Sequence, residues 1–239
     1  IVSGYPMGAK IVSNLRQNKS ISKIEAERMI SFSSTSGPLF MLGAVSVGML
    51  NNPSLAPLII YPHYLGAITL GLIFSFYKKE NKNVLKQKNL PKNLICNSTV
   101  INKTNLSIGS ILANSVKNSI NTIALIGGFM IFYSVLTELL FVSKIFNLTI
   151  NLIHNMVPIK INIEVLKGFI AGMLELTTGC KKISTTNINL IYKITLINFL
   201  IGWSGFSIHS QALSFISNTD ISSKLYIFSK FLHGSFSNP

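Results

Sequence analysis

The residues best suited to bind a solute lie where two apolar segments are interrupted. The first interruption contains Ser36-Gly37-Pro38 and the second contains Ser204-Gly205. Glycine weakens a helix, and proline leaves a carbonyl without its helical donor. Because lipid offers no hydrogen bonds, unwound backbone at membrane depth must be buried in protein or line a cavity. Freed carbonyls and helix ends at such places can bind a cation or an anionic solute. The alternative is that the small residues only permit close helix packing.

A carboxylate in an apolar stretch is the second candidate. Glu175 lies in Leu174-Glu175-Leu176, followed by Thr177 and Thr178. A charge at the centre of a membrane helix costs about 2.5–3.5 kcal/mol on insertion scales, so such a residue is a functional hypothesis by default. Glu175 would bind a coupling proton or cation, and the two threonine hydroxyls would assist. The alternative is that Glu175 reaches the interface or pairs with a neighbouring lysine.

Two further polar residues follow the second interruption. His209 and Gln211 occur in Ser207-Ile208-His209-Ser210-Gln211, directly after Gly205. Side chains beside unwound backbone are suited to hydrogen bonding with a solute. A buried histidine that only packs against its neighbours remains the alternative for His209.

These residues belong to an internal repeat. The same spacing separates Gly37 from Gly205, Ser46 from Ser214 and Gly66 from Gly234, and Gly8-Ala9-Lys10 aligns with Gly179-Cys180-Lys181 after a small length change. In membrane proteins, repeats with interrupted apolar segments indicate a transport site near the bilayer midplane. The segment matching 161–173 would precede residue 1, so we expect the chain to be a fragment that lacks part of each repeat.

The elements that must position these residues are helices. We expect short helices over 5–16 and 22–32, the latter with Ser22 as N-cap and Glu25 in a capping box. Apolar runs follow over 33–50 and 55–77, and the second is long enough to span a membrane. An interfacial helix over 107–120 would lead into a third span over 123–146, and 190–216 is a long run broken at 202–205.

The predicted organisation has four parts. Residues 1–77 form the first repeat, truncated at its N-terminus, and residues 78–105 form a basic cytoplasmic loop under the positive-inside rule. Residues 106–160 provide the linking interfacial helix, span and loop. Residues 161–239 form the second repeat, truncated at its C-terminus.

The relative orientation of the repeats depends on residues 161–183. The apolar stretch 166–178 is only about 20 Å long as a helix, which favours a re-entrant hairpin that turns near Thr177-Thr178-Gly179. Re-entry makes the repeats inverted, whereas a crossing makes them parallel. Segment length favours re-entry, and Lys181, Lys182 and Lys193 favour crossing. We adopt re-entry, and hence an all-α integral membrane protein of two inverted structural repeats with re-entrant hairpins and discontinuous transmembrane helices.

Composition excludes several other classes. The chain is 48% hydrophobic and 12% charged, with a mean hydropathy of +0.47, whereas soluble domains carry about 25% charged residues. The net charge of +14 comes from lysines between apolar runs, which does not favour nucleic acid. No motif indicates an enzyme, a cofactor or a metal site.

Four motifs carry a likeness to a known family. They are Ser3–Lys10, Ser34–Pro38, Glu175–Cys180 and Gly202–Gln211. Together they resemble the YlbJ family of sporulation integral membrane proteins of endospore-forming Firmicutes. That family looks related to the nucleoside-transporter gate domain, also seen in the iron transporter FeoB. The resemblance implies paired re-entrant hairpins, discontinuous helices around a solute site and a role in spore formation.

The expected function is translocation of a small solute or ion across the membrane of the developing spore or mother cell. The alternative is a non-transporting scaffold for cortex or envelope assembly, which docks partners through the basic loop. We expect a multi-pass protein of the cell membrane, with lipid and a small solute or coupling ion as partners and a homo-oligomer left open. The candidate binding residues are Ser36, Gly37, Glu175, Thr177, Thr178, Ser204, Gly205, His209 and Gln211.

Overall fold

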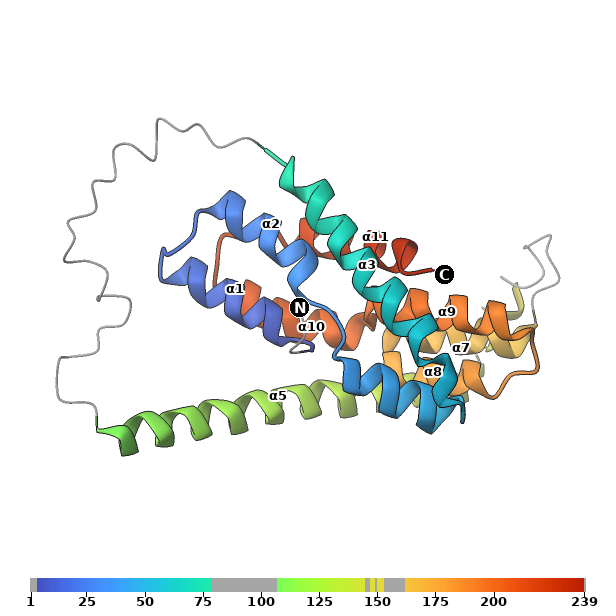
Figure 1. Ribbon diagram of the computed structural model, residues 1–239. Coiled ribbons are helices and arrows are strands. Elements are labelled where there is room, and N and C mark those ends of the chain that lie inside the picture. Colours follow the sequence, from blue (N-terminus) through green and yellow to red (C-terminus); the bar gives the residue numbers. More distant parts are fainter. Residues whose placement is uncertain (1–3, 79–106, 145–146, 149, 153–161, 239) are drawn as a thin grey trace.

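The described residues of the computed structural model form helices joined by short connections (Figure 1). The structure describes residues 4–78, 107–144, 147–148, 150–152 and 162–238. The predicted basic loop over 78–105 lies outside the described residues except for Lys78, as does most of the loop predicted before residue 161.

The first half contains two short helices followed by an interruption. Helix α1 covers Met7–Gln17 and α2 covers Lys23–Ser33. The Ser22 hydroxyl accepts from the Glu25 N–H and the Glu25 carboxylate accepts from the Ser22 N–H, which confirms the predicted capping box. Residues 34–37 are not helical, so the predicted interruption is confirmed.

The apolar run after this interruption differs from the uniform segment that we expected. Phe40–Met49 forms a π-helix, η1, and Pro53–Leu55 forms the single-turn 3₁₀-helix η2. Helix α3, Ala56–Ser75, completes the first half. At ten residues, η1 is too short to span a membrane by itself.

One continuous helix replaces the interfacial helix and span that were expected separately. Helix α5, Ile108–Val142, is 35 residues long, about 50 Å at 1.5 Å per residue. No proline interrupts this sequence, and Gly127 and Gly128 alone do not break the helix. Most of its side chains are exposed, and in Figure 1 it runs along one side of the molecule.

The second half begins with a helical hairpin. Helix α7, Ile163–Leu174, and α8, Leu176–Ser184, pack against each other so closely that a Cβ on Gly179 would lie 2.1 Å from the Gly172 Cα. The turn is at Glu175 and not at the predicted Thr177-Thr178-Gly179. Glu175 is the N-cap of α8. The turn therefore lies two residues before Thr177, where the predicted turn began.

The remaining helices bring the two halves together. They are α9, Leu190–Trp203, α10, Gly205–Ile216, and α11, Ser223–Phe236. Helix α2 packs on α11 and α3 packs on α9, while α1 packs on α10 and α8 packs on η1. One apolar core joins Met41, Ile59 and Leu200. A second joins Ala9, Ile30, Ala212 and Ile216, so each core draws on both halves.

Three helical stretches are long and apolar enough to cross a membrane. They are Pro53–Ser75, Ile108–Val142 and Leu190–Ile216. The last retains this character although it is broken at Ser204, which is not helical.

Candidate functional site

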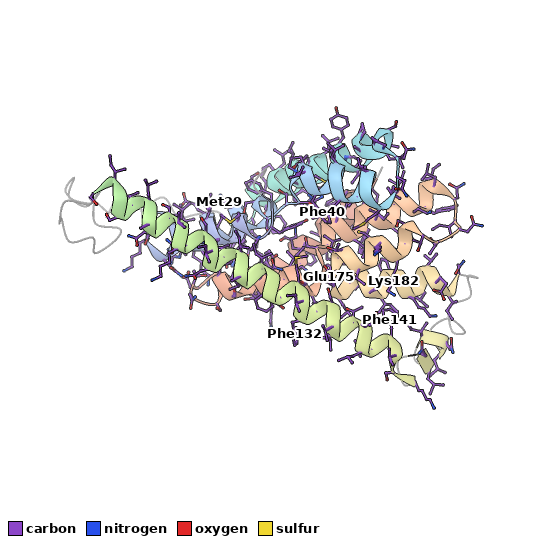
Figure 2. The ribbon with its side chains drawn as sticks, turned by 90° about the horizontal axis from the view of Figure 1, so that it is seen from below. Met29, Phe40, Phe132, Phe141, Glu175 and Lys182 are labelled. Carbon is purple, nitrogen blue, oxygen red and sulfur yellow. The ribbon has the colours of Figure 1, made fainter. Side chains whose placement is uncertain are left out.

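A cavity of about 240 Å³ lies between the two halves and α5. The first half contributes the segment before α1, the interruption and the start of η1; the second half contributes the hairpin turn and α10. In Figure 2, α5 crosses the face of the molecule, with Glu175 and Phe40 beyond it. The lining residues that matter below are Tyr5, Ser36, Met130, Glu175, Thr177 and Gln211.

Helix α5 forms the apolar wall of this cavity through Ile126 and Met130. Two hydrogen bonds attach α5 to the other helices. Lys10 Nζ donates to Thr122 Oγ1 at 2.5 Å, and the Tyr133 and Ser210 hydroxyls lie 2.7 Å apart. The wall is therefore fixed to both α1 and α10.

Glu175 is held by the helix that follows it. Its carboxylate accepts from the backbone N–H of Thr177 at 3.0 Å, from the N–H of Thr178 at 2.6 Å and from the Thr178 hydroxyl at 2.7 Å. A negative charge at a helix N-terminus is stabilised by the unpaired N–H groups and by the helix dipole. No ion pair with a lysine occurs among the described residues, so the helix end compensates the charge. The polar wall of the cavity thus contains a carboxylate that already accepts three hydrogen bonds from the start of α8.

The first interruption is held by side chains from other helices. Ser34 O accepts from Lys230 Nζ at 2.5 Å, the Ser36 N–H donates to His63 Nε2 at 3.0 Å, and Ser36 O accepts from the Tyr64 hydroxyl at 3.0 Å. Three backbone groups of the interruption therefore have partners in α3 or α11.

The second interruption is a left-handed turn. Ser204 has φ of 82° and Gly205 has φ of 73°. The Ser204 N–H donates to Leu200 O at 2.7 Å, and Ile201 O accepts from the Tyr5 hydroxyl at 2.6 Å. A Cβ on Gly205 would lie 3.0 Å from Gly172 O, so the turn sits directly against the α7–α8 hairpin.

The nine predicted site residues divide into two groups. Those that line the cavity are Ser36, Gly37, Glu175, Thr177 and Gln211. Those that do not are Thr178, Ser204, Gly205 and His209. Thr178 bonds to the Glu175 carboxylate, and Ser204 and Gly205 form the left-handed turn. His209 packs against the Trp203 ring at a centroid distance of 4.5 Å, and neither of its ring nitrogens has a hydrogen-bond partner.

A buried polar cluster was not predicted from the sequence. Lys230 and His233 of α11 are fully buried, and Lys230 Nζ lies 3.5 Å from His233 Nδ1. His233 Nε2 lies 2.9 Å from His63 O, and the two imidazole rings are 4.5 Å apart. The signal in the sequence was a lysine and a histidine three residues apart, hence on one face of an apolar helix.

Comparison with known proteins finds a sporulation protein to which the chain is similar. The chain is 34% identical, over 99% of its length, to the sporulation integral membrane protein YlbJ of Bacillus subtilis (strain 168). This similarity supports the resemblance to the YlbJ family that the four motifs indicate. The chain spans 60% of the length of that relative. No family model and no solved structure matches the chain. Together with the three membrane-capable helices, this similarity makes the chain a membrane protein.

Proposed function

We propose that this chain is the core of a membrane protein that translocates a small solute or ion during sporulation. The similarity to a sporulation integral membrane protein supports the sporulation role. The observation that carries the transport role is the cavity, because it is lined by an unwound segment from one half and a hairpin turn from the other. Irregular backbone and helix ends that meet at one cavity are typical of transport sites at the bilayer midplane.

The proposal includes two structural repeats. Helices α1, α2, η1 and α3 would correspond to α8, α9, α10 and α11. The contacts between the halves support this correspondence, because each of them has a counterpart. The pair α2–α11 matches α9–α3, and α1–α10 matches α8–η1. Such reciprocal contacts are expected where two similar units pack around a two-fold axis.

The solute would be small and largely uncharged. A volume of about 240 Å³ limits its size. Ile126, Met130 and Ile208 offer an apolar surface, while Thr177 and Gln211 offer hydrogen bonds. Glu175 occupies the N-terminus of α8, so that helix end is not free to bind an anion.

A pair of substitutions on α5 tests the function. Met130→Trp fills the cavity, whereas Ile131→Trp places the same bulk one residue away on an exposed surface. Complementation by the full-length protein is measured as heat-resistant spores, with membrane levels of each variant checked by immunoblot. We expect Met130→Trp to reduce spore yield by about tenfold or more, because an indole in the cavity occupies the space of the solute; a tenfold loss of binding corresponds to about 1.4 kcal/mol.

We expect Ile131→Trp to behave like the wild type. Equal spore yields for both variants at equal membrane levels would reject the cavity as a functional site. Deletion of the basic loop over 78–105 tests the alternative scaffold function in the same spore assay. If that deletion alone abolished sporulation, the scaffold function would replace transport.

Single cysteines test the inverted orientation. Ser20 and Asn187 are exposed and occupy corresponding connections of the two halves. In a Cys96→Ser background, Ser20→Cys and Asn187→Cys are labelled with a membrane-impermeant maleimide in intact cells and in inverted vesicles. The native Cys180 is buried and serves as the unreactive control. Labelling from opposite sides indicates inverted repeats, whereas labelling from the same side indicates parallel repeats.

A further inference from the structure

Lys230 is a fully buried lysine with no acidic partner among the described residues. Its relative exposure is 0%. The ion pairs in the described part of the chain are Arg16–Asp220 and Lys167–Glu164, and neither involves Lys230. An unpaired charge inside a protein costs several kcal/mol even after relaxation. The protonated and neutral forms of this side chain are therefore closer in free energy than they are for a lysine in water.

The surroundings of Lys230 Nζ are compatible with both the ammonium and the neutral amine. Nζ donates to Ser34 O at 2.5 Å, lies 3.5 Å from His233 Nδ1 and lies 5.0 Å from the centre of the Tyr5 ring. A carbonyl can accept from an ammonium or from an amine. The bond from the ammonium is the stronger one, because charge assistance roughly doubles a hydrogen bond.

The neighbouring histidines are held neutral by their hydrogen bonds. His63 Nε2 accepts from the Ser36 N–H, so this nitrogen carries no proton. His233 Nε2 faces the His63 carbonyl and must donate, which leaves His233 Nδ1 to accept from Lys230. A second proton on His63 would break its bond to Ser36.

Other titratable groups face this site from the surrounding elements. Helix α2 offers Glu27, which instead accepts from the Ser222 N–H at the start of α11. Helix α9 carries Lys193 at its first turn, where it donates to Ser184 O. The groups near Lys230 are Tyr5, His63, His209 and His233. Tyr64 bonds to Ser36 O, and Tyr226 packs against His209.

The site is connected to the cavity through one short segment. Lys230 holds Ser34, and His63 and Tyr64 hold Ser36. Ser36 and Gly37 line the cavity, as does Tyr5 under the Lys230 ammonium. A change of protonation at Lys230 would therefore reach the cavity wall through Ser34 and through the Tyr5 ring.

We propose that Lys230, beside the neutral His63 and His233, is the proton-binding site of this protein and that the coupling ion is H⁺. One proton binds to the Lys230 amine and holds Ser34–Gly37 in place. Its release to water leaves a neutral amine and a weaker bond to Ser34 O, which frees the segment. This inference rests on the proposed transport function, and it moves the coupling site from Glu175, the sequence-based candidate, to α11.

Proton counting with the purified full-length protein in detergent tests the site. A pH indicator in unbuffered solution reports the protons bound between about pH 9 and about pH 6, a range in which an exposed lysine stays charged. We expect the wild type to bind about one more proton than Lys230→Met or Lys230→Arg, because neither side chain exchanges a proton in this range. Lys224→Met is the matched control, since Lys224 is exposed on the same helix, and it should count like the wild type.

Hydrogen–deuterium exchange in the wild type supplies a readout that needs no variant. Exchange of the peptide over 34–40, corrected for its intrinsic pH dependence, should be faster at about pH 9 than at about pH 6. Lys230→Arg should remove this difference because arginine remains charged. Equal proton counts in the wild type and both Lys230 variants would overturn the proposal, as would exchange independent of pH in the wild type. Either result would leave the cavity and its spore phenotype standing, so this failure is distinguishable from failure of the proposed function.

Discussion

The two interruptions of the apolar helices are stabilised differently. At Ser34–Gly37 the unwound backbone is held by side chains of α3 and α11, including a buried lysine and a histidine. At Ser204–Gly205 the chain turns through two left-handed residues and rests on the α7–α8 hairpin. The first depends on groups that can change protonation, whereas the second depends on backbone geometry. We expect the first interruption to be the movable one and the second to be a fixed support.

The largest difference between them should appear on substitution of their glycines. Gly205→Ala forces a side chain onto a left-handed backbone, 3.0 Å from Gly172 O, and should lower the free energy of unfolding by about 1–3 kcal/mol. Gly37 is not among the described residues with positive φ, so Gly37→Ala should change the free energy of unfolding by less than about 1 kcal/mol. Thermal unfolding in detergent, followed by circular dichroism, compares the two. A loss at Gly37 as large as that at Gly205 would mean that both interruptions are rigid.

The two buried histidines should also respond differently. His63→Leu leaves the buried Ser36 N–H without its acceptor, which should cost about 1–3 kcal/mol. His209→Leu removes two nitrogens that have no partner and keeps apolar contact with Trp203, so unfolding should change little. The same unfolding assay measures both. A strongly destabilised His209→Leu would show that this ring has a bonding role at the second interruption.

Part of this contrast could be predicted from the sequence. The Ser22–Glu25 capping box and both interruptions depend on local residue types, and they lie where the pattern indicated. Five of the nine candidate residues line the cavity. They could be predicted because an interruption and a polar turn are recognisable from local residue types.

The rest depends on packing between distant segments. Nothing local assigns Met130 of α5 to the cavity wall, or Lys230 to Ser34, which lies in the other half. The turn at Glu175 was missed because glutamate is not among the usual N-cap residues, while the following threonines are closer to that pattern. The left-handed Ser204 was likewise hidden, since φ > 0 is uncommon for a residue other than glycine.

Tyrosine hydroxyls bond to one freed carbonyl at each interruption and allow a smaller comparison. Tyr5 donates to Ile201 O at 2.6 Å and Tyr64 donates to Ser36 O at 3.0 Å. Each phenylalanine substitution should cost on the order of 1 kcal/mol, the usual net contribution of a hydrogen bond. Unfolding of Tyr5→Phe, Tyr64→Phe and the double variant forms a cycle. Additive losses are expected if the interruptions are independent, and a clear departure from additivity would show that they are coupled.

The smallest effect is expected at the surface, where Arg16 of α1 pairs with Asp220 beyond α10. The Arg16 guanidinium donates to both carboxylate oxygens at 2.8 Å and holds the pKa of Asp220 below its ordinary value. The stabilisation is therefore present above about pH 4, the usual value for an aspartate, and is lost as the pH falls through the lowered pKa of the folded state. Asp220→Asn should lower the unfolding temperature slightly at neutral pH, less so in high salt, and not at all in strong acid.

Between about pH 6 and about pH 9 the difference in unfolding temperature between Asp220→Asn and the wild type should stay constant, because Asp220 remains ionised there. The Lys230 site, in contrast, should change its proton occupancy in this range. A difference that varied across this neutral range would mean that the surface pair responds to the buried site.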